Sequence, residues 1–291
     1  GVGVLVDAGP EGDRYEGATH AQGAGFMGAG ILWDQGGDDS FVADAFAQGA
    51  GTFGLGLLVD VAGSDTVAAR ARAQGFGSTG GLGALIDLAG NDTRRVGVAG
   101  SDRFEPGGGG GQGCGFGTRA FPFSLDVALH GGVGLLYDRA GDDVYFGSAF
   151  AQGAAWFLSL GMLLERGGRD RYTGQESSQG SAEHLAAAIL ADADGSDIYS
   201  ATERAQGYAA DRSVAVHEDR GGDADGYRLG NTGPGAVDAG REGMGFVRQA
   251  RALAIAVDDG GDDVRRGSSD ALAAGVHAAD AARDGLALLL D

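Results

Sequence analysis

Acidic side chains recur in pairs along the chain, and they are its clearest candidates for chemistry. The first acid of each pair ends an apolar segment of the form Gly-x-Gly-x-Leu-x-Asp, and the second follows five or six residues later in a Gly-x-Asp turn. Buried carboxylates are strongly disfavoured unless they cap backbone amides, pair with arginine or bind a cation. The predicted metal ligands from these pairs are Asp34, Asp39, Asp60, Asp65, Asp87, Asp92, Asp138, Asp143, Asp192 and Asp197.

Calcium is the cation that suits these turns best. It binds about six to eight oxygens from carboxylates and backbone carbonyls, whereas softer metals prefer nitrogen and sulfur ligands. The chain has 21 basic residues, all of them arginine, against 41 acidic ones, so arginine cannot neutralise every carboxylate. Calcium is therefore the expected cofactor. The competing interpretation is that each aspartate only caps its own turn, as turn aspartates commonly do.

The acidic pairs belong to a repeat that also predicts the fold. Blocks recur about every 26 or 27 residues, and most close on Ala-Gln-Gly. A fixed period in this range marks a protein in which one small unit stacks on its neighbours. Glycine occupies 59 of 291 positions and falls inside the apolar segments, where it disfavours helix. We therefore expect an all-β, Gly-rich parallel β-solenoid of roughly ten coils.

Other positions of the repeat predict how the coils pack. The segments before the first acid are apolar at nearly every position, which is typical of a sheet covered on both faces. A glycine four residues before that acid, as at Gly30 and Gly56, would let a neighbouring layer approach closely. In coils stacked about 4.8 Å apart, identical amides can hydrogen-bond along the stack. The glutamines expected to form such a ladder are Gln22, Gln48, Gln74, Gln112, Gln152, Gln179 and Gln206.

The repeat runs through almost the whole chain, so we expect a single repeat domain over 1–291. Regular coils are expected at 1–92 and 131–229, with an insertion at 93–130 and degenerate coils at 230–291. No linker composition separates these parts. Loops that leave a regular scaffold often carry function, which makes the insertion the second place to look for a site.

Three segments depart from the regular pattern. Alanine, leucine and arginine replace glycine across 242–257 and 269–283, where short helices are expected near the C-terminus. Five consecutive glycines at 107–111 lack the Lys-Ser/Thr of a phosphate-binding loop, and we expect a flexible loop there.

The Gly-x-Asp turns resemble a known calcium-binding repeat. Gly-Asn-Asp at 90–92 and Gly-Asp-Asp-Val-Tyr at 141–145 are similar to the second part of the nonapeptide of RTX β-roll proteins. In that family, glycine carbonyls and aspartates hold calcium between coils, so the resemblance implies calcium at these turns. The chain departs from the nonapeptide by having an aspartate, such as Asp34, where the first glycine would lie, and by its longer period.

Composition argues against several partners. A formal net charge of −20 disfavours nucleic acid and anionic membrane surfaces. No apolar run approaches the roughly 18 residues of a membrane helix, so membrane insertion is not expected. The lone cysteine, Cys114, excludes an internal disulfide framework. The chain opens inside a repeat block with Gly1, so we expect it to be a piece of a longer product.

These features favour a non-catalytic structural or surface protein outside the cell, with acidic turns that bind calcium. Segments 1–7 and 285–291 are copies of the same strand. A strand added at an exposed sheet edge could therefore join one copy to the next, giving self-association head to tail and filaments.

The alternative function is a polysaccharide-active enzyme on a parallel β-helix, which would make carbohydrate a partner. Acids of the columns or of the 93–130 insertion would then do glycoside chemistry. His217, beside Glu218 and Asp219, could also supply an acid and a base, although a histidine next to acids is more often a solvated pair. A catalytic pair should be unique, whereas these acids recur in nearly every coil.

Overall fold

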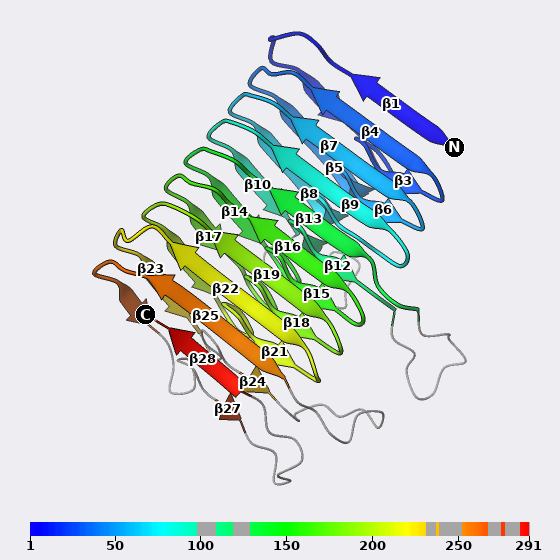
Figure 1. The fold of residues 1–291 in the computed structure, drawn as a ribbon. Helices are drawn as coiled ribbons and strands as arrows, with labels where there is room; N and C mark the ends of the chain where they lie inside the picture. The colour runs from blue at the N-terminus through cyan, green and yellow to red at the C-terminus, as the bar shows by residue number, and fades with distance from the viewer. Residues whose placement is uncertain are drawn as a thin grey trace.

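The chain forms an elongated parallel β-solenoid in which each strand pairs with the strands one coil before and one coil after it (Figure 1). The computed structural model describes residues 1–97, 109–118, 129–230, 237–238, 252–266, 275–276 and 286–290. The predicted fold class is confirmed. The solenoid makes about eight turns, slightly fewer than the roughly ten coils expected.

The first sheet contains the apolar segments, each of which ends at or just before the first acid of a pair. Its register places equivalent repeat positions on one another, so that Leu32 pairs with Leu58 and Asp34 with Asp60. The strands, in stacking order, are β1 (Val2–Val6), β4 (Ala29–Asp34), β7 (Leu55–Asp60), β9 (Leu82–Asp87), β13 (Val133–Tyr137), β16 (Leu160–Leu164), β19 (Ala187–Asp192), β22 (Val214–Arg220), β25 (Leu253–Asp259) and β28 (Leu286–Leu290).

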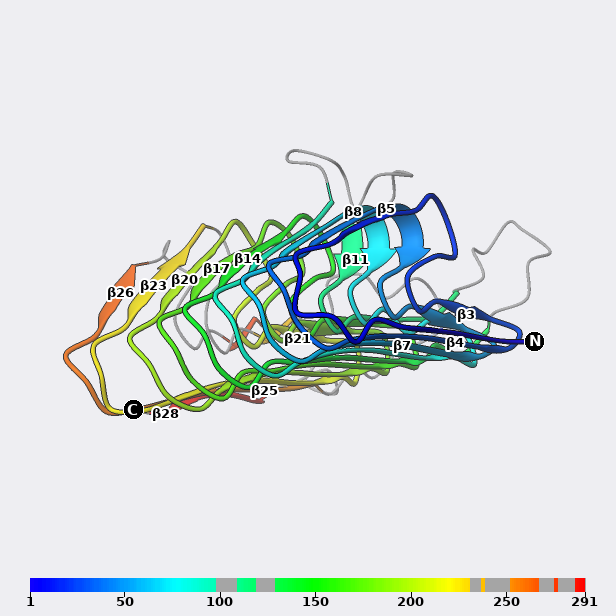
Figure 2. The ribbon, with the colours of Figure 1, turned by 90° about the horizontal axis from the view of Figure 1, so that it is seen from above.

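The second sheet follows the Gly-x-Asp turns and lies opposite the first (Figure 2). Its strands are β2 (Arg14–Glu16), β5 (Ser40–Ala47), β8 (Thr66–Ala73), β10 (Thr93–Val96), β14 (Val144–Gly147), β17 (Arg171–Thr173), β20 (Ile198–Ala201), β23 (Gly226–Leu229) and β26 (Val264–Arg266), with β11 (Gly109–Gly111) paired to β8.

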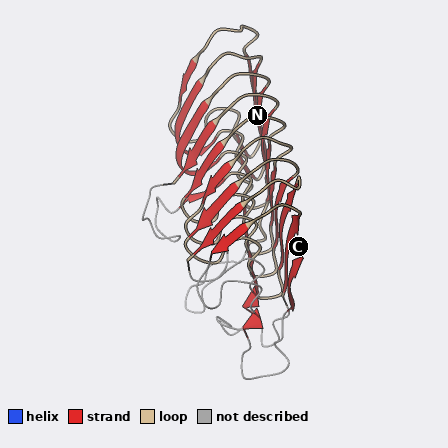
Figure 3. Cartoon of the chain, turned by 90° about the vertical axis from the view of Figure 1, so that its left-hand side faces the viewer, coloured by secondary structure: helices blue, strands red, loops and turns tan. Residues whose placement is uncertain are grey.

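Strands of two residues form a third face, which closes the coils. One group is β3 (Gly25–Phe26) with β6 (Gly51–Thr52), and the other is β12 (Gly115–Phe116), β15 (Ala155–Trp156), β18 (Ala182–Glu183), β21 (Ala209–Ala210), β24 (Val237–Asp238) and β27 (Gly275–Val276). Strands and loops account for all the described residues, which include no helix (Figure 3).

Only one face of the first sheet packs on the core. Leu32 and Leu58 are buried, at most 2% exposed, whereas Trp33 is 40% exposed. The expectation of a sheet covered on both faces is therefore wrong, because most outward side chains of the described strands reach solvent, with Val59 and Ala84 as buried exceptions. On the inward face, the leucines that stand two residues before most first acids form a column, named here the leucine column. It packs on a column of residues from the second sheet, and the two columns together make up the main core cluster.

The glycine column allows the third face to lie directly on the first sheet, as predicted. A Cβ at Gly30 would fall 2.0 Å from the carbonyl oxygen of Ala24, and one at Gly56 would fall 2.1 Å from that of Ala50. Backbone fills the space that any side chain would need. The Ala-Gln-Gly segment that leads into the third face can therefore pass close to the sheet in every regular coil.

The glutamines do not form an amide ladder. Gln74 Nε2 donates to the carbonyls of Val67 in its own coil and Arg95 in the next, both at 2.9 Å. The side-chain oxygens of all seven glutamines lack a hydrogen-bond partner, so no amide bonds another. All seven adopt φ of 51° to 56°. This left-handed corner places the amide nitrogen beside backbone carbonyls, which explains why the expected ladder is replaced by links to the backbone.

The helix expected over 242–257 is wrong where the structure describes it. β25 begins at Leu253, and its burial alternates as in a strand. It pairs in register with β22 and β28. Residues 242–251 lie outside the described residues, as do 269–274 and 277–283 of the second expected helix, which contains the short strand β27. Stacking on a neighbouring strand overrides the helix propensity of alanine and leucine.

Part of the expected insertion belongs to the solenoid itself. β10, β11 and β12 all pair with strands of neighbouring coils. The expectation of a flexible glycine loop is wrong for Gly109–Gly111, because these three residues are buried and paired with β8. Residues 98–108 and 119–128, which contain the rest of the expected insertion, lie outside the described residues.

Candidate metal centre

All ten predicted ligands lie inside the solenoid, between the first and second sheets. Each is between 0 and 3% exposed. The first acid of a pair ends a strand of the first sheet or follows it directly, and the second lies in the turn that leads to the second sheet. Asp60, for example, ends β7, and Asp65 directly precedes β8. The structure therefore brings the predicted residues together in two parallel rows along the solenoid axis.

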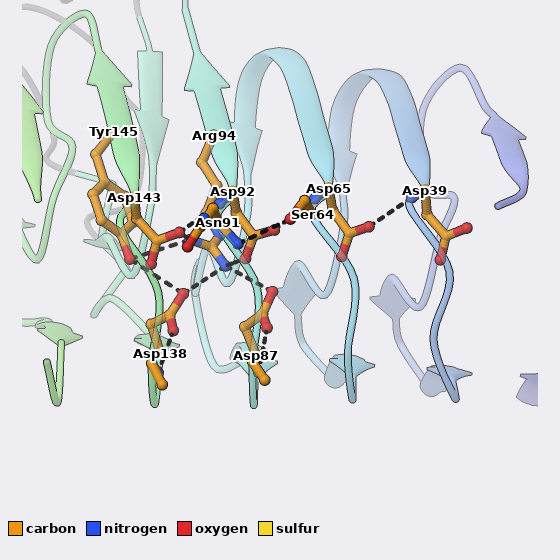
Figure 4. A network of polar contacts seen from close by, with 12 residues as sticks. Asp39, Ser64, Asp65, Asp87, Asn91, Asp92, Arg94, Asp138, Asp143 and Tyr145 are labelled. Carbon is orange, nitrogen blue, oxygen red and sulfur yellow. Dashed lines mark hydrogen bonds and ion pairs between the residues drawn. The ribbon is translucent and has the colours of Figure 1, made fainter. Parts of the chain in front are cut away.

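Each second acid caps the backbone of the coil before it. Asp65 Oδ1 accepts a hydrogen bond from the Asp39 N–H at 2.6 Å, and Asp92 Oδ1 accepts one from the Asp65 N–H at 2.6 Å (Figure 4). The same bond recurs along the described column from Asp13 to Asp263, at 2.5 to 2.9 Å. The second acids therefore cap the backbone between coils, whereas the competing interpretation predicted that each would cap its own turn.

Most first acids use one oxygen to cap their own turn, which is the geometry that the competing interpretation predicted; they are Asp7, Asp34, Asp87, Asp138 and Glu165. Asp34 Oδ1 accepts from the Gly36 N–H at 2.9 Å, and Asp138 Oδ1 accepts from the Ala140 N–H at 3.1 Å. The second oxygen of each faces the core and needs another partner.

A column on the second sheet supplies partners for those oxygens. Tyr145 donates its hydroxyl proton to Glu165 Oε2 at 2.5 Å, and its oxygen lies 3.3 Å from Asp138 Oδ2. Successive tyrosine rings from Tyr145 onward stack with centroids 4.7 to 5.1 Å apart. In register order this column, named here the donor column, is Tyr15, Phe41, Val67, Arg94, Tyr145, Tyr172, Tyr199, Tyr227 and Arg265.

Arg94 replaces a tyrosine in the donor column and acts as an internal cation. Its side chain is fully buried, and Nη2 lies 2.7 Å from Asp87 Oδ2, 2.7 Å from Asp92 Oδ2 and 2.6 Å from Asp138 Oδ2 (Figure 4). The guanidinium carbon also lies 5.3 Å from the centre of the Tyr145 ring. A buried guanidinium is stable only when it is paired in this way. One side chain therefore compensates carboxylates of two successive coils.

Between successive coils, three acids come close enough to share a metal ion. Each contributes one oxygen, and the three oxygens lie within 4.8 Å of one another. Ca²⁺–oxygen distances of about 2.3 to 2.6 Å would span such a group. Among the described residues these triads include Asp39–Asp60–Asp65, Asp65–Asp87–Asp92, Asp92–Asp138–Asp143, Asp143–Glu165–Asp170 and Asp170–Asp192–Asp197.

Asp60 differs from the other first acids of the predicted set. Both of its carboxylate oxygens are buried and have no hydrogen-bond partner. The Oδ2 atoms of Asp39 and Asp65 are also buried without a partner. The triad Asp39–Asp60–Asp65 therefore has four free carboxylate oxygens, and no donor group of the described residues reaches any of them.

Burial and neighbouring acids raise the pKa of many of these carboxyl groups. Loss of solvent, and then the charges of Asp65 and Asp87, raise the pKa of Asp60 to about 9. Burial, then the charge of Asp138, raises the pKa of Glu165 to about 10. The pKa of Asp87 rises only to about 6, because Arg94 opposes the effect of burial. Asp60 has no partner that opposes the effect of burial, so a charge on this residue is strongly penalised.

Sequence reasoning missed Val67 and Arg94. Both stand seven residues after a first acid, which is the position held by an aromatic residue in most coils. That offset was a usable signal, because a break in an otherwise aromatic column shows where the partner of the acid has changed. What the offset alone did not reveal is that this column points at the carboxylates.

The histidine and cysteine candidates take structural positions. His217 is 1% exposed and lies in the leucine column of the first sheet, beside Leu190, with neither ring nitrogen hydrogen-bonded. Burial lowers its pKa to about 4. It does not share a site with Glu218, because adjacent residues of a strand face opposite sides. Cys114 is a free, buried thiol whose pKa is raised by burial.

No protein-family model matches the chain, and comparisons with curated proteins and with solved structures give no significant match. The part of the chain that the structure describes has no helix suited to crossing a membrane.

Proposed function

We propose that the chain is a non-catalytic structural β-solenoid whose buried acidic rows bind calcium. One observation carries the proposal: carboxylates of successive coils are gathered in threes inside the protein, and several of their oxygens lack any hydrogen-bond donor. A cation shared between coils would compensate the charge and join the coils at the same time. Calcium at the submillimolar to millimolar level outside cells would suit such sites.

Burial also favours this function over the polysaccharide-active alternative. A glycosidase needs two carboxyl groups that flank a bound sugar. The ten acids considered as ligands are at most 3% exposed, so a glycan does not reach them. Acids at the core of a stacked repeat are better placed to hold the stack together than to meet a substrate.

Thermal unfolding with calcium and with chelator tests the proposed function. A ligand that binds only the folded state stabilises it by about 2.7 kcal/mol at one hundred times its Kd. We therefore expect Tm to rise with calcium and to fall on chelation. Magnesium serves as the ion control, because it demands a smaller, octahedral site and gives up water reluctantly.

A pair of variants assigns the effect to the buried rows. Asp60→Asn should lose most of the calcium-dependent rise in Tm. Asp44→Asn is the matched control, because Asp44 is 44% exposed at its side chain and pairs with Arg70 outside the rows. Equal Tm with calcium and chelator in the wild-type chain would rule out the proposal.

We also propose that copies of the chain associate head to tail through the outer strands of the first sheet. β1 pairs with β4 alone among the described strands, which leaves its other edge open. Val2, Val4 and Val6 on this strand are 77%, 60% and 63% exposed. β28 occupies the other end of the same sheet and pairs with β25 alone. An open, apolar strand edge is a template for a further strand.

Sedimentation velocity over a concentration series tests this association. The wild-type chain should form larger species as its concentration rises, and Val4→Lys should shift the distribution to monomer. Val42→Lys is the control, because Val42 is an exposed valine within the stack, on β5. A wild-type chain that stays monomeric at high concentration with calcium present excludes head-to-tail growth.

A further inference from the structure

Building on the proposed calcium binding, we infer that one level of the solenoid, Asp39–Asp60–Asp65, takes the bound ion, and that the donor column determines this choice. A hydroxyl or guanidinium in that column compensates the first acids beside it, so these levels need no ion. The level without such a group binds a hard divalent cation. The inference goes beyond the proposed function by naming the site and the residues that exclude the ion elsewhere.

A donor-column residue can serve the first acids of two coils, its own and the next. Arg94 contacts Asp87 of its own coil and Asp138 of the next. Tyr145 lies beside Asp138 of its own coil and donates to Glu165 of the next. Every first acid inside the stack is therefore flanked by two donor-column positions.

Among the first acids of the described coils, Asp60 alone has no donor at either flanking position. The position in the coil before it is Phe41, and the position in its own coil is Val67, which pairs directly with Phe41. Asp34 is flanked by Phe41 but receives the hydroxyl of Tyr15 at 2.5 Å. Asp87 follows Val67 but contacts Arg94. The free oxygens of Asp60 therefore follow directly from two residues of the donor column.

The number of free oxygens is also highest in the Asp60 triad. Asp39–Asp60–Asp65 has four free oxygens, all of them buried. The two triads that contact Arg94 have one each, Asp65 Oδ2 and Asp143 Oδ2, because the guanidinium occupies the rest of the space that an ion would fill. The triad Asp143–Glu165–Asp170 has two free oxygens. The triad Asp170–Asp192–Asp197 has three, although Asp192 Oδ2 accepts from Tyr172 at 2.7 Å.

The ligand class follows from the donor atoms. Carboxylate oxygens without nitrogen or sulfur select hard cations such as Ca²⁺, Mg²⁺ and Mn²⁺. The four free oxygens are buried and come from two successive coils. Such a site suits Ca²⁺, which is larger and tolerates irregular geometry, better than Mg²⁺, because Mg²⁺ keeps several of its waters.

Isothermal titration with CaCl₂ of the chelator-treated chain tests the inference. We expect one ion per chain for the wild type. Phe41→Tyr adds only a hydroxyl to a ring already stacked on Tyr15 at 4.7 Å. By the geometry of Tyr145, that hydroxyl should reach Asp60. The variant should unfold at a higher temperature than the wild type in chelator, and its calcium affinity should be weaker by roughly 10- to 100-fold.

Arg94→Val provides the reverse test. It copies Val67 into the next coil and frees Asp87, so the variant should bind two ions and depend on calcium for folding. If Arg94→Val does not fold even with calcium, Phe41→Tyr and Asp60→Asn still decide the matter. Unchanged stoichiometry and affinity in Phe41→Tyr, with binding intact in the wild type, overturn the inference and leave the proposed function standing. A wild-type chain that binds several ions also overturns the inference and leaves the proposed function standing. A folded wild-type chain that binds no ion overturns the inference and the proposed function together.

Discussion

Most buried acids in this protein are matched, residue by residue, to a specific partner, and Asp60 is the exception. Second acids accept the amide of the coil before, and first acids such as Asp34 and Asp138 accept their own turn amide and a donor-column group. A carboxylate that loses such a partner inside a protein bears the full cost of its desolvation. The identity of single side chains such as Tyr145 or Phe41 therefore decides the chemistry of a whole level.

Tyr145→Phe should destabilise the chain, because Glu165 Oε2 receives its hydroxyl at 2.5 Å. An unsatisfied buried acceptor costs about 1 to 3 kcal/mol, which chemical denaturation of the chelator-treated chain would measure. Tyr199→Phe is the control: Asp192 Oδ2 accepts from Tyr199 at 3.2 Å but also from Tyr172 at 2.7 Å, so the loss should be smaller. Equal losses in the two variants would contradict the view that Glu165 Oε2 depends on Tyr145 alone for its hydrogen bond.

Elements of the solenoid are joined at the corner between the second and third faces by the glutamine side chains. Six of the seven amide nitrogens reach one carbonyl of their own coil and one of the next, as Gln74 does with Val67 and Arg95. The acceptor carbonyls belong to paired strands, as those of Val67 in β8 and Arg95 in β10 do, so these bonds add to the backbone ladder. The repeat conserves its glutamine position along this chain because the corner geometry recurs in every coil.

Gln74→Met should weaken the stack at this corner. Methionine keeps the length of the side chain but donates no hydrogen bond, so two carbonyls lose their partner. We expect a loss of about 1 to 3 kcal/mol in the free energy of unfolding. Hydrogen exchange should locate the weakening in β8 and β10, the strands that Gln74 joins. Uniform loosening of all coils would instead indicate that the corner bonds do not act locally.

The molecule as a whole concentrates acidic side chains in buried rows, and its stability should therefore depend on pH in an unusual direction. Burial raises the pKa of Asp60 to about 9, of Asp170 to about 8 and of Glu165 to about 10. These folded-state values exceed the ordinary values of 3.8 and 4.5, so the folded state binds more protons than the unfolded state between them. The stabilisation is complete below about pH 4 and is lost as pH rises toward 10.

In chelator, Tm should therefore fall steadily from pH 5 to pH 9, a range that lies within this window. Calcium should flatten the profile, because the ion replaces protons on the carboxylates. A Tm in chelator that is flat or rises over this range would show that the row is charged and compensated without protons or metal.

Much of the fold was predictable because a repeat is nearly one-dimensional. Equal spacing puts Leu32 on Leu58 and Asp34 on Asp60 whatever the details of the turns, so the stacked columns follow from the sequence. The segment at Leu253–Asp259 was not predictable from its composition, because pairing with β22 and β28 made it a strand.

The sequence by itself determined which residues share a level of the solenoid, since a fixed period places equivalent positions in contact. Only the tertiary structure decided which atoms meet there. The offset of one coil that lets Asp65 cap Asp39, and the inward course of the donor column that brings Arg94 to Asp87 and Asp138, depend on the path of the turns in space. Hydrogen bonds act over about 3 Å, a scale that spacing along a chain does not resolve.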